Sequence, residues 1–180
     1  MSGKRKSIAV DMDGVIADTV AQFILWYERD HQIKITREAF YGKPEIEVLP
    51  PGVMEKIVHC PGFFRTVPVI KNAQQALLTL SKNFDIYIVS AAMEFPNSLP
   101  EKYAWLHEHF PFISWRNIIF CGDKSVIAAD YMIDDHVRNL DSFKGHPLLF
   151  TAGHNVAFQH HIRINNWKEA LDFFSGELKS

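Results

Sequence analysis

The sequence predicts an α/β fold, a doubly wound parallel sheet with a small helical cap. Three observations predict it. Short apolar runs, typical of strands buried on both faces, recur along the chain. Amphipathic helical patterns alternate with the later runs, as in a parallel sheet covered by helices. Residues 19–69 break this alternation and are too long for an ordinary connection.

Each predicted strand is a short apolar run, and the five runs are Ile8–Val10, Ile86–Val89, Asn117–Phe120, Tyr131–Ile133 and Leu148–Phe150. Helices are expected over residues 73–80, 102–110 and about 167–174, because apolar residues recur there at helical spacing. With 180 residues, 47% of them apolar, the chain is long enough to bury a core of its own.

Residues 19–69 are predicted to form a helical cap inserted after the first strand, and residues 1–18 and 70–180 the core domain. The segment opens with a helical pattern and passes through turn signals at Pro50-Pro51 and Pro61-Gly62. In an open parallel sheet, loops at the carboxyl ends of the strands surround the ligand crevice. An insert at this point is therefore expected to cover that crevice.

Charge and hydropathy exclude several classes of protein. The 19 basic and 21 acidic residues give a net charge of -2, which provides no broad cationic field for a nucleic-acid polymer or an anionic membrane. The apolar run at 8–10 is too short for a secretory signal, and no run approaches the roughly 18 residues of a membrane span. Cys60 and Cys121 lack metal-type spacing. We expect a soluble cytoplasmic protein, with a homodimer left open.

The strongest chemical signal is Asp11-Met-Asp13-Gly14, which directly follows the first predicted strand. Two acids at this spacing can hold one ligand from different sides only if the chain turns between them, and Gly14 allows that turn. Taken alone, the pattern also fits a solvated strand end. It becomes informative when similar polar groups follow other strands.

Polar groups follow three further predicted strands. Ser90 ends one, Lys124 comes just after another, and Asp134-Asp135 end a third. Singly, these residues fit a helix N-cap, a loop cation and a surface turn. Because the carboxyl ends of parallel strands share one edge of the sheet, together they predict carboxylates, a hydroxyl and an ammonium at one site.

This ordered set resembles the haloacid dehalogenase superfamily of phosphotransferases, and more closely its 5'(3')-deoxyribonucleotidases. The resemblance covers nearly the whole chain. It rests on Asp11-Met-Asp-Gly-Val-Ile-Ala-Asp18, Pro61-Gly-Phe-Phe64, Glu101-Lys-Tyr-Ala-Trp105, Asp123-Lys124, Ile133-Asp-Asp135, Phe150-Thr151, His154-Asn155 and Asn166-Trp167. It implies a Rossmann-type core and a phosphatase that dephosphorylates deoxyribonucleoside or ribonucleoside monophosphates.

The resemblance also implies roles for the residues near the phosphate. Asp11 would attack phosphorus and form an aspartyl-phosphate, while Asp13 would protonate the leaving oxygen and then activate water. Ser90 and Lys124 would hold phosphate oxygens, and the backbone amides of Met12 and Ala91 would add donors. Lys102 is a second candidate phosphate contact by its place in the Glu101–Trp105 motif, with a surface position as the alternative.

A divalent cation is expected because the site is strongly anionic. Like charges about 4 Å apart cost roughly 4 kcal/mol per pair at an effective dielectric constant of about 20, and one lysine cannot offset several such pairs beside a phosphate. An all-oxygen site favours Mg²⁺ over Zn²⁺. The candidate ligands are Asp11, Asp13, Asp134 and Asp135, and the sequence does not decide between the last two.

Aromatic residues of the cap enclose the base in relatives, which makes Phe40, Tyr41, Phe63 and Phe64 the candidate substrate pocket. The chain departs from the mammalian pattern at three places: Thr19 replaces an aromatic residue, Gly122 replaces an arginine, and Ser90-Ala-Ala replaces Thr-Ser-Pro. The replacements at Thr19 and Gly122 keep open a phosphatase of the same superfamily that acts on a sugar phosphate or another small phosphometabolite.

Two hypotheses come from other classes of protein. A response-regulator receiver domain also combines acids and a lysine at strand ends, but its acid pair comes early in the chain and it needs no cap. A binding protein that has lost catalysis is the second, and the presence of all four motifs argues against it. The sequence therefore favours an enzyme that hydrolyses phosphate monoesters.

Overall fold

The computed structural model describes residues 5–178, and a single six-stranded sheet forms its centre. All neighbouring strands are parallel, in the order β3-β2-β1-β4-β5-β6. The strands are β1 (Ser7–Val10), β2 (Asp85–Ser90), β3 (Ile118–Phe120), β4 (Tyr131–Asp134), β5 (His146–Phe150) and β6 (Ile162–Ile164). This is the strand order of a doubly wound Rossmann-type sheet, which confirms the predicted fold class.

Helices cover both faces of the sheet. The helices α4 (Ala73–Leu80), α5 (Ser98–His109) and α7 (Trp167–Glu177) bury apolar side chains in one core cluster, together with Ile8 and Val10 of β1. The short helix α6 (Val137–Ser142) packs in a second cluster that contains Ala9. Successive side chains of β1 thus enter different clusters, as expected for a strand covered on both sides.

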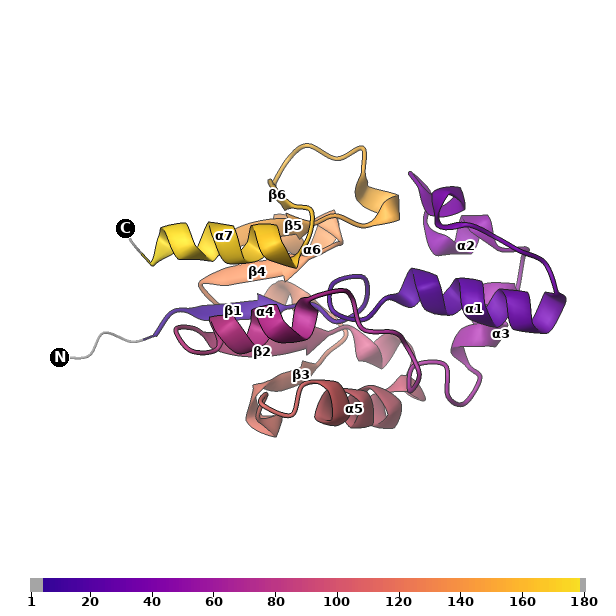
Figure 1. Ribbon diagram of the computed structural model, residues 1–180, viewed down its shortest axis with the longest axis horizontal. Coiled ribbons are helices and arrows are strands. Elements are labelled where there is room, and N and C mark those ends of the chain that lie inside the picture. The colour runs from indigo at the N-terminus through magenta and orange to yellow at the C-terminus, as the bar shows by residue number, and fades with distance from the viewer. Residues whose placement is uncertain (1–4, 179–180) are drawn as a thin grey trace.

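Residues 19–69 pack around a hydrophobic cluster of their own, centred on Phe23, Phe40 and Phe63. The segment contains α1 (Thr19–His31), the 3-10 turn η1 (Arg37–Phe40), α2 (Glu45–Val48) and α3 (Val53–Val58). Figure 1 shows α1, α2 and α3 gathered beyond the carboxyl end of β1, at the end of the molecule opposite the termini. The division into core and cap remains a prediction.

The two connections between this segment and the sheet lie side by side. The Asp18 amide donates to the Pro68 carbonyl at 2.8 Å, and the Ile70 amide donates to the Ile16 carbonyl at 2.9 Å. Asp18 also caps α1, because its Oδ1 accepts from the Ala21 amide at 3.0 Å. The entry and exit of the segment are therefore joined by backbone pairing.

The five predicted strands are confirmed, and a sixth was missed. Strand β6 has only three residues at the sheet edge and Ile162 is exposed, so it lacks the apolar run of a central strand. Helix α6 was also missed, because only Leu140 of its six residues is buried. Helix α5 begins at Ser98, earlier than predicted. Over residues 5–178, no helix is long and apolar enough to span a membrane.

Candidate active site

The site forms where the strand order reverses, between the carboxyl ends of β1 and β4. Val10 pairs with Ile133, and the Asp11 amide donates to the Ile133 carbonyl at 2.9 Å. This register brings Asp11 next to Asp134 and Asp135, and one carboxylate oxygen from each lies within 4.8 Å of the others. Crevices at such reversal points are the usual ligand sites of open α/β sheets.

Lys124 joins the nucleophile candidate to β4. Its ammonium donates to Asp11 Oδ1 and to Asp134 Oδ2, the latter at 2.6 Å, and the side chain is almost completely buried. Burial lowers the pKa of Lys124, but the charges of Asp11 and Asp134 outweigh that effect and hold it above its usual value. Lys124 therefore stays cationic and fixes the orientation of the Asp11 carboxylate.

The two adjacent acids of β4 have different surroundings. Both oxygens of Asp134 are bonded: Oδ1 accepts from the His136 amide at 2.8 Å, and Asn139 donates to both oxygens at 3.1 Å. Asp135 Oδ1, in contrast, is buried and has no hydrogen-bond partner among residues 5–178. A buried carboxylate oxygen without a partner is costly unless a cation or proton meets it. Asp135 thus fits a direct metal ligand, and Asp134 fits a residue that holds Lys124.

Burial and neighbouring negative charges disfavour the ionised forms of Asp11 and Asp135. Burial raises the pKa of Asp11 to about 7, with the Asp134 and Asp13 charges adding to the rise and Lys124 opposing it. The pKa of Asp135 is also raised well above its usual range. Burial is the largest cause, and the charges of Asp11 and Asp134 add to it. A divalent cation would relieve this repulsion, and the oxygen-only donor set suits a hard ion.

Gly14 is required by the close approach of Asp135. Its φ of +74° lies in the left-handed region, and a Cβ built there would lie 2.2 Å from Asp135 Oδ2. Any side chain at position 14 would therefore strain the backbone and displace the carboxylate.

A second polar group contains Asp13, Ser90 and Lys102. The Lys102 ammonium donates to Asp13 Oδ2 and, at 3.1 Å, to Ser90 Oγ. Lys102 is only 3% exposed, so it is part of the site and not a surface residue. Asp13 Oδ1 is buried and has no partner among the described residues. Lys102 thus holds one of the two oxygens of Asp13.

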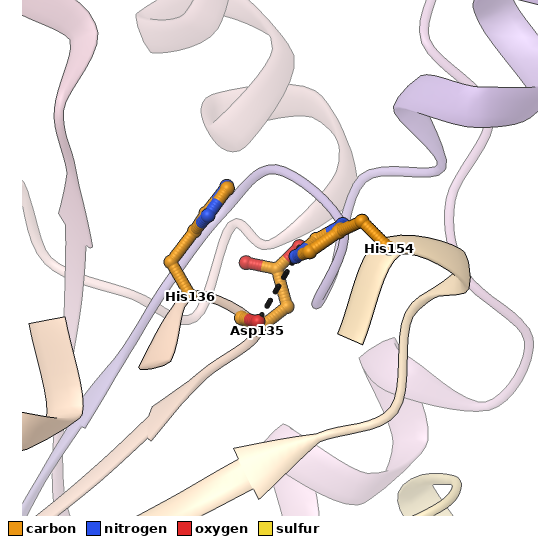
Figure 2. A group of neighbouring side chains, drawn as sticks. All are labelled: Asp135, His136 and His154. Carbon is orange, nitrogen blue, oxygen red and sulfur yellow. Dashed lines mark hydrogen bonds and ion pairs between the residues drawn. The ribbon is translucent and has the colours of Figure 1, made fainter. Parts of the chain in front are cut away.

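No chemical role was predicted from the sequence for the closing segment of the core. In the structure, two side chains of this segment bind the backbone carbonyl of Asp135. His154 Nε2 donates to the Asp135 carbonyl at 3.1 Å, and Asn155 Nδ2 donates to the same oxygen at 2.8 Å. Figure 2 shows His154 beside Asp135, with the His136 ring facing it, and the two imidazoles stack with centroids 4.6 Å apart. Nothing in their spacing links residues 154 and 155 to position 135 before the chain folds.

A cavity of about 160 Å³ joins the carboxylates to the inserted segment. Phe63 and Phe64 line it, and so do the predicted site residues Asp11, Asp13, Ala91, Lys102, Lys124 and Asp135. Phe40 and Tyr41 do not: they line a separate hollow beside Gly153, because Phe40 is buried in the core of the inserted segment. The cavity wall also contains residues that the sequence analysis did not name as binding residues, namely Phe23, Glu45, Met54, Val58, Glu94, Phe95, His136, Arg138 and Asn139.

Comparison with known proteins identifies the family of this chain. A family model described as "5' nucleotidase, deoxy (Pyrimidine), cytosolic type C protein" matches residues 5–178. A Staphylococcus aureus (strain Mu50) protein named "Putative 5'(3')-deoxyribonucleotidase" is 41% identical over 177 residues, covering 97% of this chain and 98% of the relative. The "5'(3')-deoxyribonucleotidase" of Bacillus subtilis (strain 168) is 35% identical over 167 residues, covering 92% and 96%.

Solved structures share the fold at low identity. The haloacid dehalogenase-like family protein SP0104 from Streptococcus pneumoniae aligns with a TM-score of 0.61 and 13% identity, covering 94% of this chain and 98% of its own. YfnB from Bacillus subtilis, solved bound to magnesium, aligns with a TM-score of 0.57 and 15% identity, covering 94% and 99%. The chain therefore belongs to the 5'(3')-deoxyribonucleotidase family, has a haloacid dehalogenase-like fold, and is a phosphoric monoester hydrolase of the 5'-nucleotidase type.

Proposed function

We propose that this protein is a Mg²⁺-dependent phosphatase that hydrolyses deoxyribonucleoside and ribonucleoside monophosphates through an aspartyl-phosphate on Asp11. One observation carries the proposal. A single cavity is lined by the Asp11 carboxylate fixed by Lys124, by Asp13 and Asp135, each with one buried oxygen that has no hydrogen-bond partner among residues 5–178, and by the apolar side chains of Phe63 and Phe64. The relatives named as deoxyribonucleotidases support the substrate class.

The metal would be held by Asp11 and Asp135, with the backbone carbonyl of Asp13 as a further candidate. Asp134 lies in the same cluster, but its oxygens are occupied by Lys124, Asn139 and the His136 amide. When bound, Mg²⁺ would neutralise the carboxylates and polarise the phosphoryl oxygens. Magnesium bound to YfnB supports the choice of ion, and the oxygen donors agree with it.

The reaction needs a nucleophile and an acid on opposite sides of phosphorus. A carboxylate oxygen of Asp11 forms a bond to phosphorus while the bond to the sugar oxygen breaks, and Asp13 gives its proton to that oxygen. Water then attacks the phosphorus of the aspartyl-phosphate, and Asp13 takes the proton that the water loses. The products are a nucleoside, inorganic phosphate and the regenerated Asp11 carboxylate.

Two lysines and Ser90 stabilise the transferring group. Lys124 remains charged beside Asp11, and Lys102 reaches both Asp13 and Ser90, so two ammonium groups border the place where negative charge develops. The backbone amides of Met12 and Ala91 are candidate additional donors. Ser90 contributes a neutral hydroxyl at the end of β2.

Residues 19–69 would act as a cap over the bound nucleotide. Phe63 is fully buried and Phe64 is 4% exposed, and both belong to the inserted segment and line the cavity that contains Asp11. Enclosure by these rings would exclude bulk water during phosphoryl transfer. Thr19 also lines the cavity, where the mammalian pattern has an aromatic residue.

Phosphate release from a panel of nucleoside monophosphates and sugar phosphates, with Mg²⁺ and with EDTA, tests the proposal. Release from nucleotides that requires Mg²⁺ is expected. Turnover of sugar phosphates alone would favour the alternative of a small-metabolite phosphatase. Nucleotide binding without release would favour a binding protein.

Replacement of the nucleophile tests the mechanism separately. Asp11→Asn should lower kcat by at least about 10³-fold, because an amide cannot form the phosphoryl intermediate. The variant should keep a cooperative thermal transition. Full activity in Asp11→Asn would refute the assignment, and a phosphorylated wild-type enzyme that never turns over would favour the receiver-domain hypothesis.

A further inference from the structure

One carboxylate of the core holds both ends of the turn that carries Phe63 and Phe64. Glu101, in the first part of α5, accepts from the Gly62 amide on Oε1 at 2.6 Å and from the Arg65 amide on Oε2 at 3.0 Å. Each oxygen of the carboxylate thus holds one end of the segment between Gly62 and Arg65. Hydrogen bonds to a charged acceptor are among the stronger ones in proteins.

The neighbouring residue on α5 serves the phosphate site. Lys102 donates to Asp13 and Ser90, and its ammonium also lies 4.9 Å from the centre of the Phe64 ring. Residues 101 and 102 therefore connect two parts of the cavity, since one orients the aromatic turn and the other meets the reacting carboxylate. The Pro61–Phe64 and Glu101–Trp105 motifs are far apart in sequence and bind each other through these contacts.

The other contacts of the turn differ from that of Glu101, whose charged side chain links the backbone of the turn to α5. Gln22 of α1 donates to the Phe63 carbonyl at 2.6 Å, which holds the turn to the inserted segment itself. Glu108, also on α5, pairs with the Arg65 guanidinium, but that pair is largely exposed and exposed pairs contribute little. Phe63 packs on Phe23 with ring centroids 4.9 Å apart, so the turn also contacts the apolar cluster of the inserted segment.

We propose that Glu101 is a positioning residue that sets substrate selection, because it fixes Phe63 and Phe64 against the phosphate site. This inference rests on the proposed nucleotide phosphatase activity. Loss of the carboxylate frees the two amides and lets the aromatic turn shift relative to Lys102. Contacts to the nucleoside would weaken, while contacts to a phosphate group alone would not.

The test compares kcat and KM for a deoxyribonucleoside monophosphate with those for glycerol 3-phosphate, a small ester without a base. For Glu101→Ala, KM for the nucleotide should rise about tenfold, equivalent to about 1.4 kcal/mol, with kcat/KM for glycerol 3-phosphate unchanged. Glu101→Gln keeps the size and one acceptor oxygen, so it should retain part of the discrimination even if the alanine variant folds poorly.

Two more variants separate the turn from helix α5. Gly62→Ala leaves Glu101 intact but strains the turn, because Gly62 has φ +90°. The added Cβ causes no clash, since no atom lies within 4 Å of it. It should lower discrimination as Glu101→Ala does. Glu108→Gln removes the other acidic contact to Arg65 and should leave both substrates unaffected.

The outcomes are distinct. Wild-type preference for the nucleotide that persists in Glu101→Ala would overturn the positioning role, and so would an equal loss with both substrates. A wild-type enzyme with no preference for the nucleotide would refute the proposed function, and the inference would fail with it.

Discussion

Replacement of Asp135 by asparagine should stabilise the metal-free protein while abolishing its activity. Asp135 is 3% exposed, and its Oδ1 has no hydrogen-bond partner in the described part of the chain. At pH 8 the unfolded chain carries this carboxylate ionised, so folding must bury the charge or bind a proton. Asparagine has nearly the same shape and removes that cost.

The magnitude follows from the geometry of the cluster. Carboxylate oxygens of Asp11, Asp134 and Asp135 lie within 4.8 Å of one another. Two negative charges at that separation repel by about 3.5 kcal/mol at an effective dielectric constant of about 20. Attraction to Lys124 offsets part of this, so we expect a net gain of about 2 kcal/mol. For a chain of this size the gain corresponds to a rise in Tm of about 4–8 °C.

Thermal melting in EDTA at pH 8 measures the effect, with Asp172→Asn as the control. Asp172 is an exposed acid on α7, and its replacement should change stability by less than about 0.5 kcal/mol. Mg²⁺ should raise the Tm of the wild type more than that of Asp135→Asn. If Asp135→Asn melts at or below the wild type in EDTA, buried repulsion at this carboxylate is not a cost in the folded protein.

Three further predictions concern the same site. The metal-free protein should lose stability as pH rises from about 4 to about 7. The reason is that the pKa of Asp11 is raised from 3.8 to about 7, so the folded state binds its proton more tightly than the unfolded state does. Calorimetry in EDTA that shows constant or rising stability over this range would contradict the prediction. Gly14→Ala should lose activity and destabilise the fold by about 2 kcal/mol or more, since φ is +74° and the Cβ would meet Asp135; wild-type Tm and turnover would refute the close approach. Asn155→Ala should cost about 2–4 kcal/mol in urea unfolding, because Asn155 is fully buried and bonds the carbonyls of Asp135 and Phe150; a loss below about 0.5 kcal/mol would show that water replaces the amide.

Much of the fold follows from local pattern. Central strands such as β1 are continuous apolar runs because both faces are buried, and helix α4 coincides with the predicted residues 73–80. Strand β6 and helix α6 were missed because each buries a single side chain and shows no periodicity. Hydrophobic periodicity in a sequence reflects which side chains are buried, so elements at the edge of the structure show only weak periodicity.

The candidate site was likewise predicted only in part from the sequence. The sequence by itself determined that Asp11, Lys124 and the Asp134-Asp135 pair stand at or just after the ends of strands, because strand ends are visible in the chain and parallel strands end at one edge. Only the tertiary structure decided how the two adjacent acids differ. Neighbouring residues at a strand end point to opposite sides, and packing places Asn139 on Asp134 and leaves Asp135 without a partner for Oδ1.

Long-range contacts were decided by the fold as well. Phe63 reaches the cavity and Phe40 does not, although both are aromatic residues of one inserted segment. Glu101 binds the Gly62 and Arg65 amides across a separation that no local pattern reveals. Residue type and spacing specify which chemistry a chain can perform, whereas the partners of each side chain are fixed only when distant segments pack together.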